Sequence, residues 1–211
     1  MTITTEKKER RTLRYAERAD TPERVINEWL TQRHWSETMY LEMAERENVY
    51  VELDDGKVVF HTMPTTEHQT IVGNLFVALR EYARALPAPG RVLIAPTPVR
   101  LWPLKMREPD VMFFKAEHLD RIGTQRSGIP DFVAEVLSPS TLELDTEQKM
   151  TEYALAGIPE YWVIDPERHI VSVYVLEGEE YHLVTEYSSG HRAQAQTLSG
   201  FSVAVEDVWQ P

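Results

Sequence analysis

The segment DFVAEVLS, residues 131–138, places a carboxylate at the centre of an apolar run. Glu135 follows Phe132 and Val133 and precedes two further apolar residues, a pattern that predicts a strand buried in the core. An ionised carboxylate that is buried without a partner costs several kcal/mol. Any fold of this chain therefore has to bring a compensating group from another segment to Glu135.

The clearest helix in the sequence begins near residue 66, where Thr66 to Gln69 fit a capping box. Its apolar residues recur at helical spacing, at Ile71, Leu75 and Leu79. Proline and glycine at residues 87–90 are expected to end it. Two short helices are predicted within residues 22–47, and a further helix is predicted to end at Gly157.

Apolar and alternating runs typical of strands lie between these helices. Two of them are expected to form hairpins, with turns at Gly56 and Gly178. Together the elements predict an α/β (α+β) fold in which helices flank a mixed central sheet, with a helical and hairpin segment added at the N-terminus and a hairpin at the C-terminus. The predicted strand regions are residues 49–61, 91–102, 109–114, 131–138, 160–166 and 169–190.

Composition narrows the class of protein. A chain of 211 residues with 42% hydrophobic content suits one globular domain, expected at residues 36–211, after a charged helical extension at residues 1–35. No run of 18 apolar residues and no signal-peptide pattern is present, so a cytoplasmic protein without a membrane partner is expected. Zero cysteines leave oxygen and imidazole as possible metal ligands. The net charge of −12 disfavours non-specific binding to a polyanion but does not exclude a local basic cleft.

Three residues can be linked into a site. Asp110 opens one apolar strand, Glu135 lies inside the next, and Lys149 shares a face of the following helix with Asp145 and Tyr153. If the two strands are neighbours, the two carboxylates converge, and a divalent cation is one remedy for their repulsion. Such an oxygen-rich site suits magnesium and phosphate substrates.

The ordered motifs resemble a known family. PD at residues 109–110, EVLS at 135–138 and GIPEYWVIDP at 157–166 are similar to the PD-(D/E)XK nuclease superfamily, and specifically to the Uma family of restriction-type endonucleases. The resemblance covers about residues 36 to 209. It implies a restriction endonuclease-like fold and hydrolysis of DNA phosphodiester bonds, with Mg²⁺ as cofactor and Mn²⁺ able to replace it. It also implies a homodimer.

The resemblance also implies roles for individual residues. Asp110 and Glu135 would bind the metal with the backbone carbonyl of Val136. The sequence departs from the superfamily pattern because Leu137, two residues after Glu135, stands where a lysine is usual. The resemblance places that lysine on the next helix, as Lys149. Further acidic or metal-binding candidates are Glu52, Glu67 and His68.

Other interpretations remain open. Lys149 also fits a solvated helix lysine that pairs with Asp145 or Glu152, and Glu67 fits a first-turn acid favoured by the helix dipole. The acidic balance and the missing lysine beside Glu135 also fit a catalytically silent binding or interaction module with the nuclease fold. The same carboxylates would equally serve a hydrolase of a smaller phosphoester.

Overall fold

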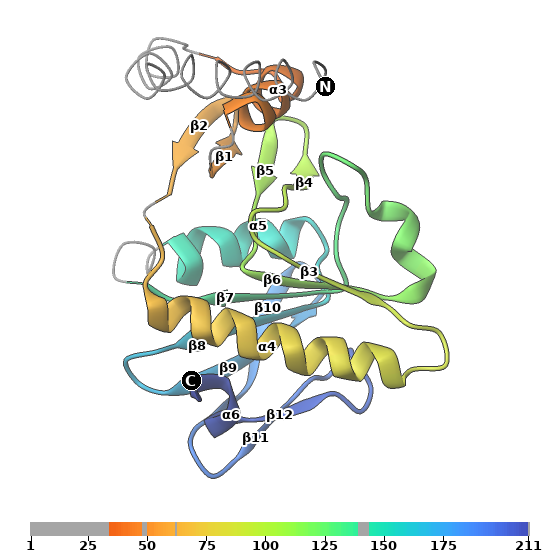
Figure 1. The fold of residues 1–211 in the computed structure, drawn as a ribbon, viewed down its shortest axis with the longest axis vertical. Helices are drawn as coiled ribbons and strands as arrows, with labels where there is room; N and C mark the ends of the chain where they lie inside the picture. Colours follow the sequence, from red (N-terminus) through yellow and green to blue (C-terminus); the bar gives the residue numbers. More distant parts are fainter. Residues whose placement is uncertain (1–33, 48–49, 62, 139–143, 211) are drawn as a thin grey trace, which may run out of the picture.

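The computed structural model describes residues 34–47, 50–61, 63–138 and 144–210. The predicted N-terminal extension, apart from its last two residues, and the first predicted short helix lie outside these residues, so the boundary at residue 35 stays a prediction. Figure 1 shows a small sheet with helix α3 at the top of the molecule and a larger sheet crossed by helix α4 below it. Within the described residues, no helix is both long enough and apolar enough to span a membrane.

The small sheet has the strand order β2-β1-β5-β4, and its paired strands are antiparallel. Positive φ angles at Asp55 and Gly56, 48° and 78°, form the tight turn of the predicted first hairpin. Apolar residues of α3, β1 and β5 pack together in one cluster. The elements are α3 (Glu37–Glu47), β1 (Val51–Asp54), β2 (Lys57–Phe60), β4 (Val99–Trp102) and β5 (Lys105–Arg107).

The central sheet has six strands in the order β10-β9-β8-β7-β6-β3. β7 and β8 are parallel, and every other neighbouring pair is antiparallel, which confirms the predicted mixed sheet. The C-terminal hairpin forms its edge, with Gly178 at the predicted turn. The strands are β3 (Arg91–Ile94), β6 (Val111–Phe114), β7 (Phe132–Val136), β8 (Glu160–Asp165), β9 (Ile170–Glu177) and β10 (Glu180–Tyr187).

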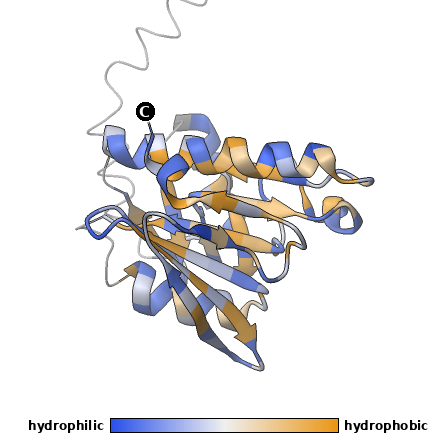
Figure 2. Cartoon of the chain, turned by 90° about the horizontal axis from the view of Figure 1, so that it is seen from below, coloured by the Kyte–Doolittle hydropathy of each residue, from blue (hydrophilic) through white to orange (hydrophobic). Residues whose placement is uncertain are grey.

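One face of the central sheet is covered by α4 (Thr66–Ala85), the short helix α6 (Val205–Trp209) and the hairpin of β11 (Arg192–Gln194) and β12 (Ser202–Ala204). Figure 2 shows hydrophobic residues along the strands and on the long helix that lies over them. The cap of α4 differs from the prediction by one residue. Thr65, and not Thr66, is the capping residue, and its side chain accepts a hydrogen bond from the backbone N–H of His68.

The other face carries a second apolar cluster, built by β4, the helix α5 (Lys149–Leu155) and the strands of the sheet. A single π-helical turn, η2 (Leu144–Gln148), leads into α5, and Gly157 with a φ of 79° follows its end as predicted. The 3₁₀ segment η1 (Ala116–Arg121) lies in the loop between β6 and β7. Both faces of β7 are therefore covered, so the site of Glu135 lies in the interior.

Glu160 of β8 binds the segment between β11 and β12 to the central sheet through hydrogen bonds. Its carboxylate is fully buried and accepts hydrogen bonds from Trp162 Nε1 at 2.7 Å, from the backbone N–H of Thr197 at 2.7 Å and from Thr197 Oγ1 at 2.6 Å. We expect Glu160→Ala to lower the free energy of unfolding by about 3 kcal/mol, because several buried donors lose their acceptor. Urea denaturation measures this. Glu180→Ala, at an exposed hairpin position, is the control, and equal stability of the two variants would contradict the assigned role.

Candidate active site

Asp110 and Glu135 lie side by side at the end of two neighbouring strands. Val111 of β6 pairs with Ala134 of β7, so Asp110, one residue before β6, lies opposite Glu135. The backbone N–H of Asp110 donates to Glu135 Oε2 at 3.3 Å, and the backbone N–H of Val136 donates to Asp110 Oδ2 at 2.8 Å. The structure thus brings the two predicted carboxylates together, each held by a backbone amide of the other strand.

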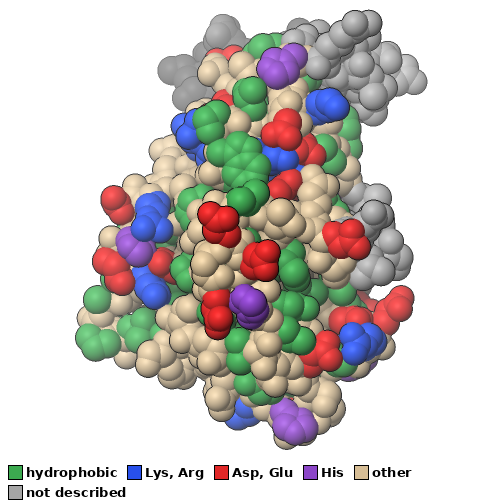
Figure 3. Space-filling view, turned by 180° about the vertical axis from the view of Figure 1, so that it is seen from behind, with side chains coloured by type: hydrophobic (Ala, Val, Ile, Leu, Met, Phe, Trp, Pro, Cys, Tyr) green, Lys and Arg blue, Asp and Glu red, His purple; other side chains and the backbone are tan. Residues whose placement is uncertain are grey.

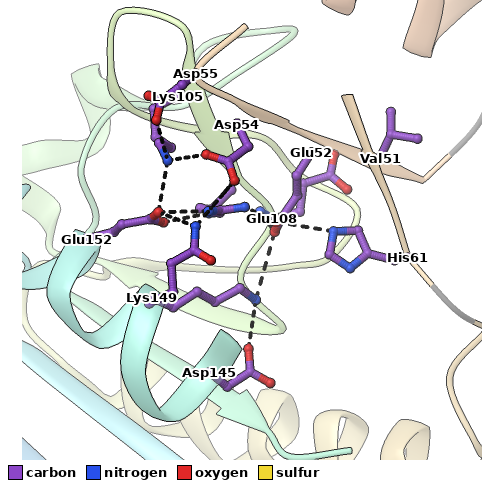
Figure 4. A network of polar contacts seen from close by, with 12 residues as sticks. Val51, Glu52, Asp54, Asp55, His61, Lys105, Glu108, Asp145, Lys149 and Glu152 are labelled. Atoms are coloured by element: carbon purple, nitrogen blue, oxygen red, sulfur yellow. Dashed lines mark hydrogen bonds and ion pairs between the residues drawn. The ribbon is translucent and has the colours of Figure 1, made fainter. Parts of the chain in front are cut away.

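Lys149, the first residue of α5, reaches the same point. Its Nζ lies 2.8 Å from Glu135 Oε1, 3.1 Å from Asp145 Oδ1 and 3.8 Å from Glu52 Oε1. Figure 4 shows the lysine extending between Asp145 and the strand that carries Glu52. The charge that compensates Glu135 therefore comes from α5, while Leu137 lines the neighbouring cavity. The π-helical turn before α5 aims Asp145 at Lys149.

Tyr153 is a contact that the sequence did not assign to the site. Its hydroxyl donates to Glu135 Oε1 at 2.6 Å, the oxygen that Lys149 also contacts. The sequence offered one signal for this contact, because Tyr153 lies one helical turn after Lys149 and so shares its face of the helix. A buried tyrosine is more often a core residue, and Tyr153 is also part of the core cluster beneath β7.

Burial dominates the electrostatics of this group. The exposed fraction is 2% for Glu135 and 4% for Lys149. Burial raises the pKa of Glu135 well above its ordinary value; Lys149 acts to lower it, and Asp110 raises it further. Burial acts to lower the pKa of Lys149, but the surrounding acids, Glu135 first, raise it well above its ordinary value. Burial therefore favours the neutral form of Glu135 more than that of a free carboxyl, whereas the surrounding acids favour the charged form of Lys149.

These residues form the floor of a cavity of about 1020 Å³. The other walls come from the end of the first hairpin, the start of α4, the β3–β4 connection and the turn between β8 and β9. Asp110, Glu135, Val136, Asp145 and Lys149 all line it. The predicted residues therefore lie in a concave space large enough for a substrate.

The three accessory candidates differ in position. His68 Nε2 lies 3.1 Å from Asp110 Oδ2; burial acts to lower the pKa of His68, but the hydrogen bond and charge of Asp110, with the charge of Asp145, together raise it. Glu67 is exposed and lines the cavity beside His68. Glu52 is fully buried behind the floor, where Arg107 donates to it at 2.8 Å.

A buried ion cluster supports the floor from the side of the small sheet. Arg107 donates to both oxygens of Glu152, at 2.7 and 2.8 Å, and Lys105 donates to Glu152 and Asp54. Figure 4 shows Asp54 of β1, Lys105 of β5 and Glu152 of α5 converging on one another. The sequence did not predict this cluster, because residues 103–108 lie between the predicted strands at 91–102 and 109–114 and have the composition of a polar loop. They include the buried strand β5, and lysine and arginine are rarely buried unless paired.

The donor atoms present fit a hard divalent cation. Two carboxylates meet at the floor, and Val136 lines the cavity beside them. Oxygen ligands completed by water suit a hard divalent cation, and such a cation would favour the charged form of Glu135. Among the described residues, no group of three or more histidine, aspartate or glutamate side chains is arranged to hold a metal ion. Backbone and water oxygens would have to supply the remaining ligands.

A mixed sheet with helices on both faces and this pair of carboxylates defines a restriction endonuclease-like fold. A family model described as Uma2, putative restriction endonuclease, matches residues 37–206, and the chain therefore belongs to this family. The crystal structure of a putative nuclease belonging to DUF820 from Anabaena variabilis ATCC 29413 is similar, with a TM-score of 0.62 and 18% sequence identity over 75% of this chain and 89% of that chain. No curated protein matches the chain. The comparisons confirm the predicted family and fold.

Proposed function

We propose that the protein is a divalent-metal-dependent nuclease that hydrolyses DNA phosphodiester bonds. The observation that carries the proposal is the convergence of Asp110, Glu135 and Lys149 on the floor of one cavity. Membership of a family described as putative restriction endonucleases supports a nucleic-acid substrate. The proposal includes a homodimer, which rests on the resemblance to restriction-type endonucleases.

Asp110 and Glu135, with the backbone carbonyl of Val136, would hold the cation. A divalent cation supplies electrostatic stabilisation of a phosphoryl group and favours deprotonation of an attacking water. Lys149 would neutralise charge that develops on the phosphate. Asp145 lies 3.1 Å from Lys149 and retains it at the floor, and Tyr153 fixes the orientation of Glu135.

The test is a plasmid-nicking assay with purified protein in Mg²⁺, in Mn²⁺ and in EDTA. We expect nicking in both metals and none in EDTA, and we expect Asp110→Asn to lose activity by roughly a thousandfold because it removes a cation ligand. Asp120→Asn, on the distant η1 loop, is the matched control. Equal activity of Asp110→Asn and wild type would remove the proposed site.

Two further outcomes identify the alternatives. Cleavage of a small phosphodiester such as bis(p-nitrophenyl) phosphate, without nicking of DNA, would favour a hydrolase of smaller phosphoesters. No turnover of any substrate, together with no heat of Mg²⁺ or Mn²⁺ binding by calorimetry, would favour a binding module.

A further inference from the structure

The cavity has an aromatic wall next to its charged floor. Tyr50, which precedes β1, and His61, which follows β2, both line it. Their rings are stacked, with centroids 4.8 Å apart and an angle of 27° between the planes. Met63, which is 92% exposed, and Pro64 continue the apolar surface toward the mouth. A nucleic-acid base is a flat partner for such a surface.

This wall is held rigidly. His61 Nε2 lies 3.2 Å from Glu52 Oε2, and the same oxygen accepts a hydrogen bond from Arg107 at 2.8 Å. Tyr50 lines the same cavity as Asp110 and Glu135; burial raises the pKa of its hydroxyl, and the charge of Asp110 raises it further. A base stacked on Tyr50 would therefore lie beside the carboxylates.

The charges around the cavity do not favour a long duplex. Besides the acids of the floor, the described residues that line the cavity include three acids, Glu67, Asp165 and Glu167. The basic lining residues are Arg168 and the buried Lys149. Arg168 itself lies 3.9 Å from Asp165 Oδ2. Duplex binding depends on several lysine or arginine contacts to phosphates along the helix. Figure 3 shows acidic side chains across the middle of one face of the molecule, with basic ones mainly toward its edges.

The depth of the floor also restricts which form of nucleic acid can reach the carboxylates. Asp110, Glu135 and Lys149 are each more than nine-tenths buried, so a phosphate has to enter the cavity to reach them. A nucleotide within a stacked duplex is held by its neighbours and its complement. Enzymes that do chemistry on a base act on single strands or take the nucleotide out of the stack, and an unpaired nucleotide is likewise freer than a paired one to enter a recessed cavity.

We propose that the cavity takes an unpaired nucleotide, with its base stacked on the Tyr50–His61 wall and its phosphate at the Asp110–Glu135 floor. The substrate class is therefore single-stranded DNA or an unpaired stretch within a duplex. This inference rests on the proposed nuclease function and names the form of substrate that the site accepts.

Fluorescence anisotropy in Ca²⁺ compares three probes: a fluorescein-labelled DNA oligonucleotide, its duplex with the complement, and the same duplex with a central bulge. We expect the single strand and the bulged duplex to bind roughly tenfold more tightly than the plain duplex, and to be cut preferentially in Mn²⁺. Equal or preferred binding and cutting of the plain duplex would overturn the inference and leave the nuclease function standing. Absence of binding and cutting with all three probes would overturn both.

Variants test the aromatic wall itself. Tyr50→Leu is expected to weaken single-strand binding roughly tenfold, because stacking on one base is lost, whereas Tyr50→Phe keeps the ring and the affinity. Phe60→Leu, an exposed aromatic residue outside the cavity lining, is the control and should bind as wild type. His61→Leu provides the same comparison if Tyr50→Leu fails to fold. Wild-type affinity in a folded Tyr50→Leu or His61→Leu variant would overturn the stacking role.

Discussion

A Glu135→Gln variant is expected to lose roughly a thousandfold in nuclease activity and yet to unfold at a higher temperature than the wild type at pH 8. Activity is lost because glutamine is a poor ligand for a divalent cation. Stability is gained because burial raises the pKa of Glu135 well above its ordinary value of 4.5. The folded protein keeps a proton that the unfolded chain has released, so the wild type loses stability as the pH rises from 4.5 toward the raised pKa.

Thermal unfolding in EDTA at pH 6 and pH 8 measures this effect. The difference in unfolding free energy between Glu135→Gln and the wild type should grow with pH. Between pH 4.5 and the raised pKa of Glu135 it grows by up to about 1.4 kcal/mol per pH unit. A wild type that is more stable than the variant at both pH values would contradict the protonated state of Glu135, and would show that its carboxylate is ionised beside Lys149.

Glu152→Gln is the matched control on the same helix. Burial acts to raise the pKa of Glu152, but Arg107, together with Lys105 and Gln148, holds the pKa below its ordinary value of 4.5. Glu152 therefore contributes stability that is present above pH 4.5 and is lost as the pH falls through the lowered pKa. The control variant should be less stable than the wild type by the same amount at pH 6 and pH 8.

An Arg107→Met variant is expected to lose about 3 to 5 kcal/mol of unfolding free energy, or roughly 10 °C in Tm. Arg107 is fully buried and donates to Glu52 and Glu152. Its removal leaves buried carboxylates without their partner. The free-energy cost of an unpaired buried charge exceeds the net contribution of the ion pair to stability. Differential scanning calorimetry and urea denaturation measure the loss.

Two variants separate burial from charge. Arg168→Met removes an arginine whose side chain is 59% exposed and whose acidic partners lie 3.6 and 3.9 Å away, so the expected loss is at most about 1 kcal/mol. Arg107→Lys keeps the charge but not the planar guanidinium group that contacts both oxygens of Glu152. Its loss of unfolding free energy is therefore expected to lie between those of Arg168→Met and Arg107→Met. Equal stability of Arg107→Met and Arg168→Met would refute the structural role of the cluster.

Most of the secondary structure was predictable because its signals are local. The helix from Thr66 and the turns at Gly56 and Gly178 follow from apolar spacing and from residues that tolerate a positive φ. The cap of α4 was placed one residue late because Thr65 and Thr66 are adjacent and either fits the pattern. The strand β5 was missed because a buried strand of charged residues contradicts the usual composition of a core.

The candidate site was predictable in part. Asp110 and Glu135 were expected to converge if their strands were neighbours, and β6 and β7 are paired. The hydrogen bond from Tyr153 to Glu135 and the contact between His68 and Asp110 were not, since each depends on how a helix lies against the sheet. The catalytic and metal-binding roles of these residues stay predictions until the variants are measured.

The sequence by itself determined that a carboxylate would be buried in β7 and that a compensating group had to reach it, because an isolated buried charge is too costly to keep. It also carried the ordered motifs that identify the family. The resemblance already placed a lysine at Lys149, but only the tertiary structure shows that its Nζ reaches Glu135 Oε1, at 2.8 Å. Arg107 and Lys105 also bind Glu152 of the same helix, and that pairing joins residues more than forty positions apart in the chain. Long-range ion pairs of this kind leave no local pattern.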